Sequence, residues 1–195
     1  MICDPDPTIL EWDVDWNSDK SLKNWYLKFD LICAADWKKV MPGAMYFIGL
    51  SFTTTWLPPF SDMYGRKSFF LVTMFSCLLF HLGIYFTTHW SVVIVMALCI
   101  GLVASLRVQV GFNYLIELFP KNMQVLAGSV YCVLDGIVYI ITVVYFWKIS
   151  NDWSNYFLFV FVANLISLIG TLFLPESPRM LADLGRKEET VKSLE

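Results

Sequence analysis

The sequence is poor in charge for its length. Of its 195 residues, 16% are Asp, Glu, Lys or Arg, whereas a soluble globular chain carries about 25%. The net charge of −3 leaves no basic excess that would bind the phosphates of a nucleic acid. With 57% hydrophobic residues, the chain is also too apolar to be intrinsically disordered. The composition therefore indicates a protein whose partner is the lipid bilayer and not nucleic acid.

The signatures of metal and enzyme chemistry are missing as well. No CxxC or HExxH pattern occurs, and His81 and His89 stand alone, so we expect neither a metal nor a cofactor. No nucleophile–base pair and no phosphate-binding loop points to an enzyme. His81 lies inside an apolar stretch, where we expect a hydrogen-bonded packing residue.

The five cysteines fall into two groups. Cys77, Cys99 and Cys132 lie within apolar segments and are expected to be small packing residues. Cys3 and Cys33 lie in the polar N-terminal segment, where they would pair if that side of the membrane is oxidising. The sequence leaves this pairing open.

Three long stretches contain no charged residue: 40–61, 68–106 and 153–175. About 20 apolar residues cross about 30 Å of hydrocarbon, and lipid offers the backbone no hydrogen bonds, so each span must be helical. The middle stretch is too long for one helix and is interrupted near His89, and a further apolar segment contains only Asp135. The sequence therefore predicts an all-α, polytopic membrane helix bundle with five transmembrane helices, at about 40–60, 68–87, 91–118, 124–147 and 155–174.

The ends of the chain are polar. The N-terminal segment carries eight acids and five lysines. Basic residues close to helix ends, such as Arg66, Lys67 and Lys121, favour the cytoplasm for their side of the membrane. The predicted domains are an extracellular polar segment, a transmembrane bundle and a cytoplasmic segment, at 1–39, 40–174 and 175–195.

Two charged residues lie deep in the predicted membrane core. Arg107 precedes Glu117 by ten residues and Asp135 follows Gln124 by eleven, which at 1.5 Å per residue places both about 15 Å below the cytoplasmic helix ends. A charge at this depth costs about 2.5–3.5 kcal/mol on insertion scales and usually has a partner. We therefore predict a salt bridge between Arg107 and Asp135. Whether the two residues form a substrate site or only a structural pair stays open.

Polar side chains accompany both charges. The spacing of Tyr131, Asp135 and Tyr139 places them along one helix face, and Tyr114 shares half a helix circumference with Arg107. A helix with such a face lines a wet cavity or a polar interface. The candidate substrate-cavity residues are Arg107, Asp135, Tyr114, Tyr131 and Tyr139.

Small residues also recur along the predicted helix 124–147. Gly128, Cys132 and Gly136 follow one another at four-residue spacing. Such a stripe lets helices approach closely in lipid. We therefore predict that a neighbouring helix packs against this stripe.

Three charged motifs resemble signatures of the major facilitator superfamily. The loop Asp62-x-x-Gly65-Arg66-Lys67 resembles the loop signature of that superfamily. The run Glu117-Leu118-Phe119-Pro120 resembles the Glu-x-x-Pro that closes the fourth helix of its sugar and organic-ion porters, and Pro175-Glu176-Ser177-Pro178-Arg179 resembles a signature of the same group. Physically, these acids and bases would form an ion-pair cluster under the bundle that latches one conformational state. The resemblance implies a gating latch made of Asp62, Gly65, Arg66, Lys67, Glu117, Glu176 and Arg179.

The segment before the first predicted helix narrows the resemblance. Phe29-Asp30-Leu31-Ile32-Cys33, followed by Trp37, resembles the passage before the second helix of organic cation and anion transporters. The resemblance implies helices 2–6 of one major facilitator half, with the missing half on the same or another chain. It also implies a small organic solute, moved by alternating access, and a multi-pass protein of the plasma membrane. A sugar porter fragment is the alternative within the transport class.

A second alternative comes from departures from the motifs. Gln124 and Ala97 occupy positions where that group commonly has arginine. A degenerate half-transporter that binds a membrane partner through its exposed half interface would fit these losses.

Overall fold

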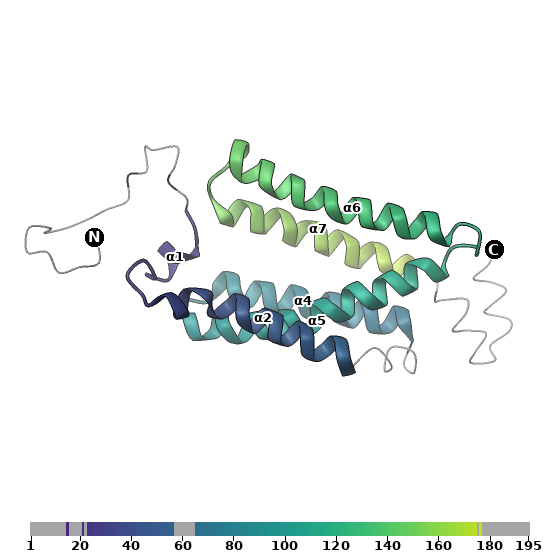
Figure 1. The fold of residues 1–195 in the computed structure, drawn as a ribbon, viewed down its shortest axis with the longest axis horizontal. Helices are drawn as coiled ribbons and strands as arrows, with labels where there is room; N and C mark the ends of the chain where they lie inside the picture. Colours follow the sequence, from purple (N-terminus) through teal and green to yellow (C-terminus); the bar gives the residue numbers. More distant parts are fainter. Residues whose placement is uncertain (1–14, 16–20, 22, 57–64, 175, 177–195) are drawn as a thin grey trace, which may run out of the picture.

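The computed structural model describes residues 15, 21, 23–56, 65–174 and 176. Four of its helices are long and apolar enough to cross a membrane, namely α4, α5, α6 together with η1, and α7. This confirms the predicted all-α membrane helix bundle (Figure 1). The helices are α1 (Trp25–Lys28), α2 (Asp36–Trp56), α4 (Arg66–Phe86), α5 (Trp90–Glu117), α6 (Gln124–Val144), the π-helix η1 (Tyr145–Ile149) and α7 (Trp153–Phe173).

Helix α2 differs from the four spanning helices. It has 21 residues, but its first turns contain Asp36, Lys38 and Lys39, and it is not among the helices apolar enough to span. The helix begins four residues before the predicted boundary at 40. Asp36 in its first turn stabilises this earlier start, because its negative charge complements the helix dipole. That α2 forms a fifth membrane span stays a prediction.

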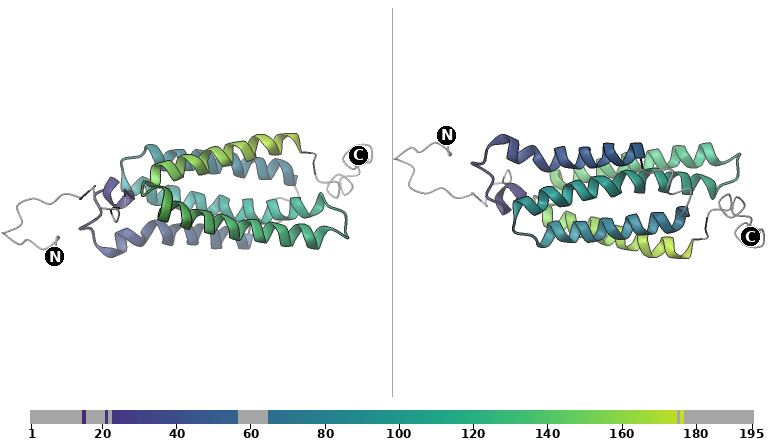
Figure 2. Two further views of the ribbon diagram at one scale, coloured as in Figure 1. Left: turned by 90° about the horizontal axis from the view of Figure 1, so that it is seen from above. Right: turned by 90° about the horizontal axis from the view of Figure 1, so that it is seen from below.

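Helix α5 is the centre of the bundle. It packs against α2, α4 and α6, while α7 packs against α4 (Figure 2). Helices α2 and α5 run in the same direction, because the indole of Trp90 donates to the Lys38 carbonyl near one end and Thr54 hydrogen-bonds Ser105 near the other. Helix α2, from the first part of the chain, thus packs directly against α5, from the middle of the chain.

Two glycines make the α2–α5 contact possible. A Cβ on Gly101 would overlap the Tyr46 carbonyl, and a Cβ on Gly49 would lie 2.9 Å from the Leu102 nitrogen. The backbones therefore approach each other as small residues allow in membrane helices. Neither glycine belongs to the small-residue stripe predicted from the sequence.

The prediction that a helix packs closely along the small-residue stripe of α6 is wrong for the helices that the structure describes. Nothing lies within 4 Å of a Cβ built on Gly136, and Cys132 is exposed. A Cβ built on Gly128 would lie 3.5 Å from the Phe112 ring. Spacing along one helix cannot show which of its faces meets a neighbour, and none of the residues described in α6 is buried.

Candidate functional site

A cavity of about 620 Å³ opens between α4, α5, α6 and α7. Most of its lining is apolar or aromatic, with Phe70 from α4 and Val160 from α7 among it. The polar lining comes from three different helices. It consists of Arg107 and Tyr114 on α5, Tyr131 and Asp135 on α6, and Asn164 and Ser167 on α7.

The predicted salt bridge between Arg107 and Asp135 does not form. Both residues line the cavity, but among the described residues no ion pair joins them. Matching depth on neighbouring antiparallel helices does not bring two side chains together, because α5 and α6 make few contacts along their length. The cavity therefore presents a positive and a negative group that do not neutralise each other directly.

Tyr139 lies outside this cavity. Its side chain is 68% exposed, and Val138 occupies the lining position instead. At about 100° per residue, Val138 lies only about 20° from Tyr131 around the helix, whereas Tyr139 lies about 80° away. Four of the five candidate substrate-cavity residues thus share one cavity, and their role in binding stays a prediction.

Asn164 is a cavity residue that the sequence analysis missed. Its side-chain oxygen Oδ1 is buried and accepts no hydrogen bond from any residue that the structure describes. A buried polar atom without a partner is costly, so it marks a place where a ligand or water is stabilised. The available signal in the sequence was an asparagine in the middle of a charge-free helix, between apolar residues on both sides.

His81 has the packing role expected from the sequence. Its ring nitrogen Nδ1 donates to the Cys77 carbonyl at 2.7 Å and lies 3.4 Å from the Cys77 sulfur. Its ring also packs on Phe157 with centroids 5.7 Å apart. This intrahelical hydrogen bond gives the Nδ1–H of the imidazole a partner inside the bundle.

The motif residues meet at the end of the bundle where α5 ends. The Arg66 guanidinium forms an ion pair with the Glu117 carboxylate, and their side chains are only 17% and 9% exposed. Arg66 opens α4 and Glu117 closes α5, so the pair joins two antiparallel helices at one end. Solvent screens a pair this shielded much less than an exposed one.

Glu176 and Lys67 connect α4 with α7 at the same end. The Glu176 carboxylate accepts a hydrogen bond of 2.9 Å from the Lys67 backbone N–H, where the helix dipole favours a negative charge. In return, the Lys67 ammonium donates to the Leu172 and Leu174 carbonyls at the end of α7. Lys67 of α4 thus caps the end of α7, and Glu176, just after α7, caps the start of α4.

Gly65 makes room for this exchange. Its φ of 101° lies in the left-handed region, which glycine adopts at little cost. A Cβ there would lie 3.5 Å from the Glu176 carboxylate. Five of the seven predicted latch residues therefore come together, while Asp62 and Arg179 lie outside the described residues; gating by this cluster stays a prediction.

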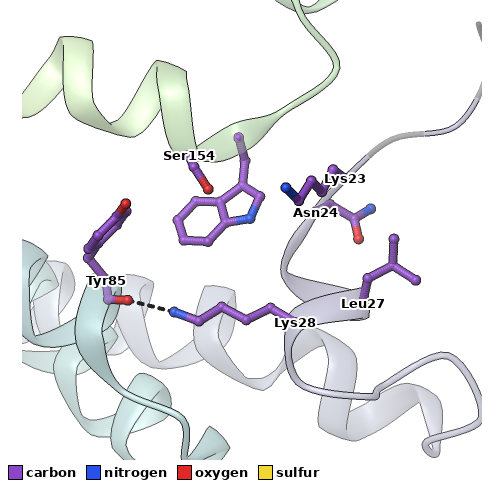
Figure 3. Close-up of a pocket in the computed structure, with 7 residues that line it drawn as sticks. Lys23, Asn24, Leu27, Lys28, Tyr85 and Ser154 are labelled. Carbon is purple, nitrogen blue, oxygen red and sulfur yellow. Dashed lines mark hydrogen bonds between the residues drawn. The ribbon is translucent and has the colours of Figure 1, made fainter. Parts of the chain in front are cut away.

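The short helix α1 lies at the opposite end of the bundle, and it was not predicted from the sequence. The Lys28 ammonium donates to the Tyr85 carbonyl at 2.7 Å, where α4 ends (Figure 3). It also lies 5.3 Å from the Trp153 ring centroid, and partial burial lowers the pKa of Lys28. A small cavity of about 490 Å³ lies beside these groups.

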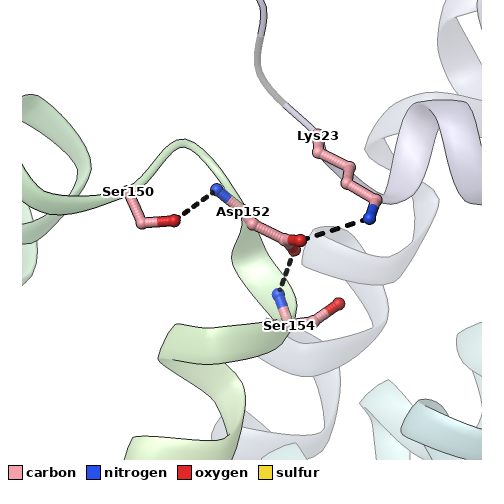
Figure 4. Close-up of polar contacts among 4 residues, drawn as sticks. All are labelled: Lys23, Ser150, Asp152 and Ser154. Atoms are coloured by element: carbon pink, nitrogen blue, oxygen red, sulfur yellow. Dashed lines mark hydrogen bonds and ion pairs between the residues drawn. The ribbon is translucent and has the colours of Figure 1, made fainter. Parts of the chain in front are cut away.

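Lys23 attaches α1 to the start of α7. Its ammonium lies 3.3 Å from the Asp152 carboxylate, which also accepts a 2.8 Å hydrogen bond from the Ser154 N–H as the N-cap of α7 (Figure 4). Burial opposes ionisation of Asp152, but the hydrogen bonds from Ser154 and the charge of Lys23 outweigh it and lower the pKa of Asp152. Residues 23–28 thus hold the ends of α4 and α7 together.

The cysteines follow the predicted packing role only in part, because Cys77 is buried whereas Cys132 is exposed. Cys33, which follows α1, is disulfide-bonded. Cys77, Cys99 and Cys132 are free, and Cys3 lies outside the described residues.

Fold and cavity together define the class of the protein as a multi-pass membrane helix bundle with a charged cavity between its helices. Comparison with known families agrees: the family model described as "Sugar (and other) transporter" matches residues 32–195. The chain belongs to this family. The resemblance to major facilitator transporters is thereby confirmed, and the comparisons point to a transporter rather than an enzyme.

Individual relatives come from two branches of transporters. The chain is 23% identical to rat organic cation/carnitine transporter 2, over 90% of this chain and 31% of the relative. It is 25% identical to mouse solute carrier family 22 member 4, over 89% of this chain and 32% of the relative. It is 31% identical to mouse solute carrier family 2, facilitated glucose transporter member 12, over 68% of this chain and 22% of the relative. The chain thus spans about a third or less of these curated relatives.

Proposed function

We propose that the chain forms the solute-binding part of a plasma-membrane transporter for small organic ions that works by alternating access. The observation that carries this proposal is the presence of Arg107 and Asp135 in one cavity without an ion pair between them. A charge inside the bilayer is costly unless it is compensated. A bound organic ion supplies that compensation.

The chemistry of the cavity favours an organic ion over a sugar. A sugar site needs hydrogen-bonding partners for many hydroxyl groups, because each buried group left unpaired is costly. Here most of the lining is apolar or aromatic, which suits the carbon skeleton of an organic ion. The organic cation/carnitine transporter among the relatives supports the same choice by its name.

The two charges also suggest the charge type of the solute. Arg107 is suited to an anionic group and Asp135 to a cationic group. A solute that carries both groups compensates both residues at once, while a simple cation or anion compensates only one. We therefore infer that a small zwitterion binds more tightly than either singly charged analogue.

The ion pair and hydrogen bonds at the Glu117 end of α5 support alternating access. The Arg66–Glu117 pair and the Lys67–Glu176 contacts join α4, α5 and α7 below the cavity. A set of contacts that closes one end of a bundle can hold one of two conformational states and release in the other. The latch function rests on this arrangement.

Direct binding tests the proposal. The purified chain in lipid nanodiscs would be titrated with glycine betaine, tetraethylammonium, benzoate and glucose. We expect saturable binding, tightest for the zwitterion; Asp135→Asn should weaken betaine and tetraethylammonium and spare benzoate, and Arg107→Gln should weaken betaine and benzoate and spare tetraethylammonium. Binding of glucose alone, or of none of the four probes, would contradict the proposal.

A second candidate function has one observation in its favour. Helix α6 is apolar enough to span a membrane, yet none of its described residues is buried. The exposed apolar surface of α6 is available to another membrane segment, as the alternative of a half-transporter that binds a membrane partner requires. Cross-linking from Val143 on this face, in cells, would support that alternative if it captures a second membrane protein while the four probes fail to bind.

A further inference from the structure

The cavity beside α1 lies at the end of the bundle where α4 ends and α7 begins (Figure 3). It has a volume of about 490 Å³, and we call it the α1 cavity. Residues of α1 and the two positions before it form one side, and Tyr85 of α4 with Trp153 and Ser154 of α7 form the other. The α1 cavity shares no lining residue with the charged cavity around Arg107 and Asp135, so it is a separate candidate site.

The polar side chains of the α1 cavity have hydrogen-bond donors to spare. An ammonium group has three N–H donors, and Lys28 uses two of them on carbonyls at the end of α4, at 3.4 and 2.7 Å. The side-chain oxygen of Asn24 accepts from the Tyr26 N–H, which leaves the amide N–H groups of Asn24 available. The Ser154 hydroxyl donates to none of the residues that the structure describes. Since the lining contains no carboxylate, a ligand that fits this cavity supplies acceptors.

The two lysines of the α1 cavity differ in how their charges are compensated. Lys23 lies 3.3 Å from the Asp152 carboxylate, whereas Lys28 has no acidic partner in the part of the chain that the structure describes. The Lys28 ammonium lies 5.3 Å from the Trp153 ring centroid and 5.9 Å from that of Tyr85. Partial burial lowers the pKa of Lys28, because the cation loses hydration without gaining an anion. An anionic ligand would restore that compensation.

The donor types favour a tetrahedral oxyanion over a carboxylate. The planar fork of arginine matches a carboxylate best, whereas lysine is a common phosphate ligand that acts as a point charge. The lining contains two lysines and no arginine. It also presents the apolar side chain of Leu27 and the ring of Trp153, which suit the organic part of a ligand. A phosphate ester therefore fits the lining better than inorganic phosphate.

The position of the α1 cavity also agrees with a phosphate ligand. Helices α4 and α7 are both apolar enough to cross a membrane. The cavity takes Tyr85 from the last turn of α4 and Ser154 from the first turn of α7. The ends of such spans lie at the level of the lipid head groups, where Tyr and Trp are enriched. A phospholipid can present its phosphodiester there, and so can a soluble ester from the water.

We propose that the α1 cavity is a binding site for a phosphate ester, whose anionic oxygens accept hydrogen bonds from Lys28, Asn24 and Ser154. The ester comes either from a phospholipid head group or from a soluble molecule. This inference goes beyond the proposed function and does not rest on it. Since residues 23–28 already join α4 to α7, a ligand at this place would add a further bridge between these segments.

Three methyl esters test the chemistry of the site. Methyl phosphate and dimethyl phosphate are anionic, whereas trimethyl phosphate has a similar shape and no charge. Each would be titrated into the full chain in dodecyl maltoside, a detergent without phosphate, and binding would be followed by phosphorus NMR. For a soluble source we expect the two anionic esters to bind and trimethyl phosphate not to bind.

Native mass spectrometry tests the lipid source. The same preparation would be offered phosphatidylglycerol or digalactosyl diacylglycerol with identical acyl chains, of which only the first carries a phosphodiester. If a phospholipid occupies the site, we expect selective retention of phosphatidylglycerol. Equal retention of the two lipids would mean that the acyl chains alone are bound.

Substitutions assign the binding to the α1 cavity. Lys28→Gln removes the uncompensated charge and should weaken binding of the anionic ligand about tenfold or more, because it removes a charge-assisted hydrogen bond. Ser154→Ala removes one neutral donor and should weaken binding by about two- to tenfold. Lys38→Gln is the matched control. Lys38 lies at the same end of the bundle, where its carbonyl accepts from the Trp90 indole, but it does not line the cavity.

The outcomes are distinct. Selective binding of the anionic esters or of phosphatidylglycerol, weakened by Lys28→Gln and not by Lys38→Gln, supports the proposal, and the arm in which it occurs identifies the source. No selective binding in either arm, or equal affinity of the two lysine variants, overturns it. Loss of binding in Arg107→Gln would place the anion in the charged cavity and overturns it as well. If Lys28→Gln does not fold, Ser154→Ala decides, and unchanged binding in that variant overturns the proposal.

Discussion

Two pairs of oppositely charged side chains in this protein differ in whether they form an ion pair. Arg66 and Glu117 are shielded and paired, so each compensates the other. Arg107 and Asp135 share a cavity but no ion pair. The first pair stabilises the fold directly, and the second leaves both charges available to a ligand. Double-mutant cycles separate these situations, because they isolate the interaction energy of two residues.

For Arg107 and Asp135 we expect nearly additive effects. The free energy of unfolding would be measured in detergent for Arg107→Gln, Asp135→Asn and the double variant. Residues without a shared contact couple by no more than about 0.5 kcal/mol. A coupling energy above about 1 kcal/mol would instead show that the salt bridge predicted from the sequence does form.

For Arg66 and Glu117 we expect strong coupling. Removing one partner leaves the other charge shielded and uncompensated, which is the costly state. The same unfolding measurement on Arg66→Gln, Glu117→Gln and the double variant should give an interaction energy of about 1–3 kcal/mol. The Arg107–Asp135 cycle serves as the internal control, and equal coupling in both cycles would refute this distinction.

At the scale of elements, helix ends and helix contacts explain how the bundle is held together. Glu176 caps α4 from a segment more than 100 positions away in sequence, and Lys67 caps α7 in return. At the α2–α5 contact, Gly49 and Gly101 let the two helix backbones lie close together, because glycine has no side chain between them. Both devices depend on one or two residues, so single substitutions test them.

Loss of the Glu176 cap should destabilise the protein. Replacing a capping acceptor by alanine costs about 1 kcal/mol, and the lost negative charge near the dipole adds to it. Glu176→Ala should therefore lower the unfolding free energy by about 1–2 kcal/mol, while Glu176→Gln, which keeps an acceptor, should lower it less. Equal stability of Glu176→Ala and the unmodified chain would exclude the cap.

The glycines of α5 and α6 should respond in opposite ways to alanine. Gly101→Ala places a methyl group against the Tyr46 carbonyl and should cost about 1–3 kcal/mol through overpacking. Gly136→Ala meets nothing within 4 Å and should be neutral or stabilise by up to about 1 kcal/mol, because alanine favours the helix. Thermal unfolding of the two variants side by side checks the contrast; similar losses would contradict the α2–α5 contact.

At the scale of the whole molecule, each end of the bundle is joined by contacts between distant segments. One end is held by the Arg66–Glu117 and Lys67–Glu176 contacts. The other is held by residues 23–28, which reach α4 through Lys28 and α7 through Lys23. The charged cavity lies between these two ends.

Acidification should loosen the end held by α1. The pKa of Asp152 is lowered in the folded protein from 3.8, so its contribution to stability is present above that value and is lost as pH falls through the lower, folded pKa. We expect faster amide hydrogen exchange at residues 23–31 below about pH 3.8 than at neutral pH, after correction for the intrinsic rates. Asp152→Asn should show the faster exchange already at neutral pH and little further pH dependence. If the pH dependence of exchange in Asp152→Asn equalled that of the unmodified chain, the loosening would belong to another titrating group.

The sequence by itself determined the helical bundle and the meeting of its charged motifs. Long uncharged stretches require helices in lipid, and charges next to helix ends return to the same side of the membrane, as Arg66 and Glu117 do. These are properties of spacing along the chain. They need no knowledge of how the helices pack.

Only the tertiary structure decided which faces meet. It separated Arg107 from Asp135, left Tyr139 outside the cavity and brought Asn164 into it. It also chose Gly101, not Gly136, for close packing. The reason is physical: periodicity fixes the relative positions of side chains on one helix, while the rotation and separation of neighbouring helices result from the packing of all of them together.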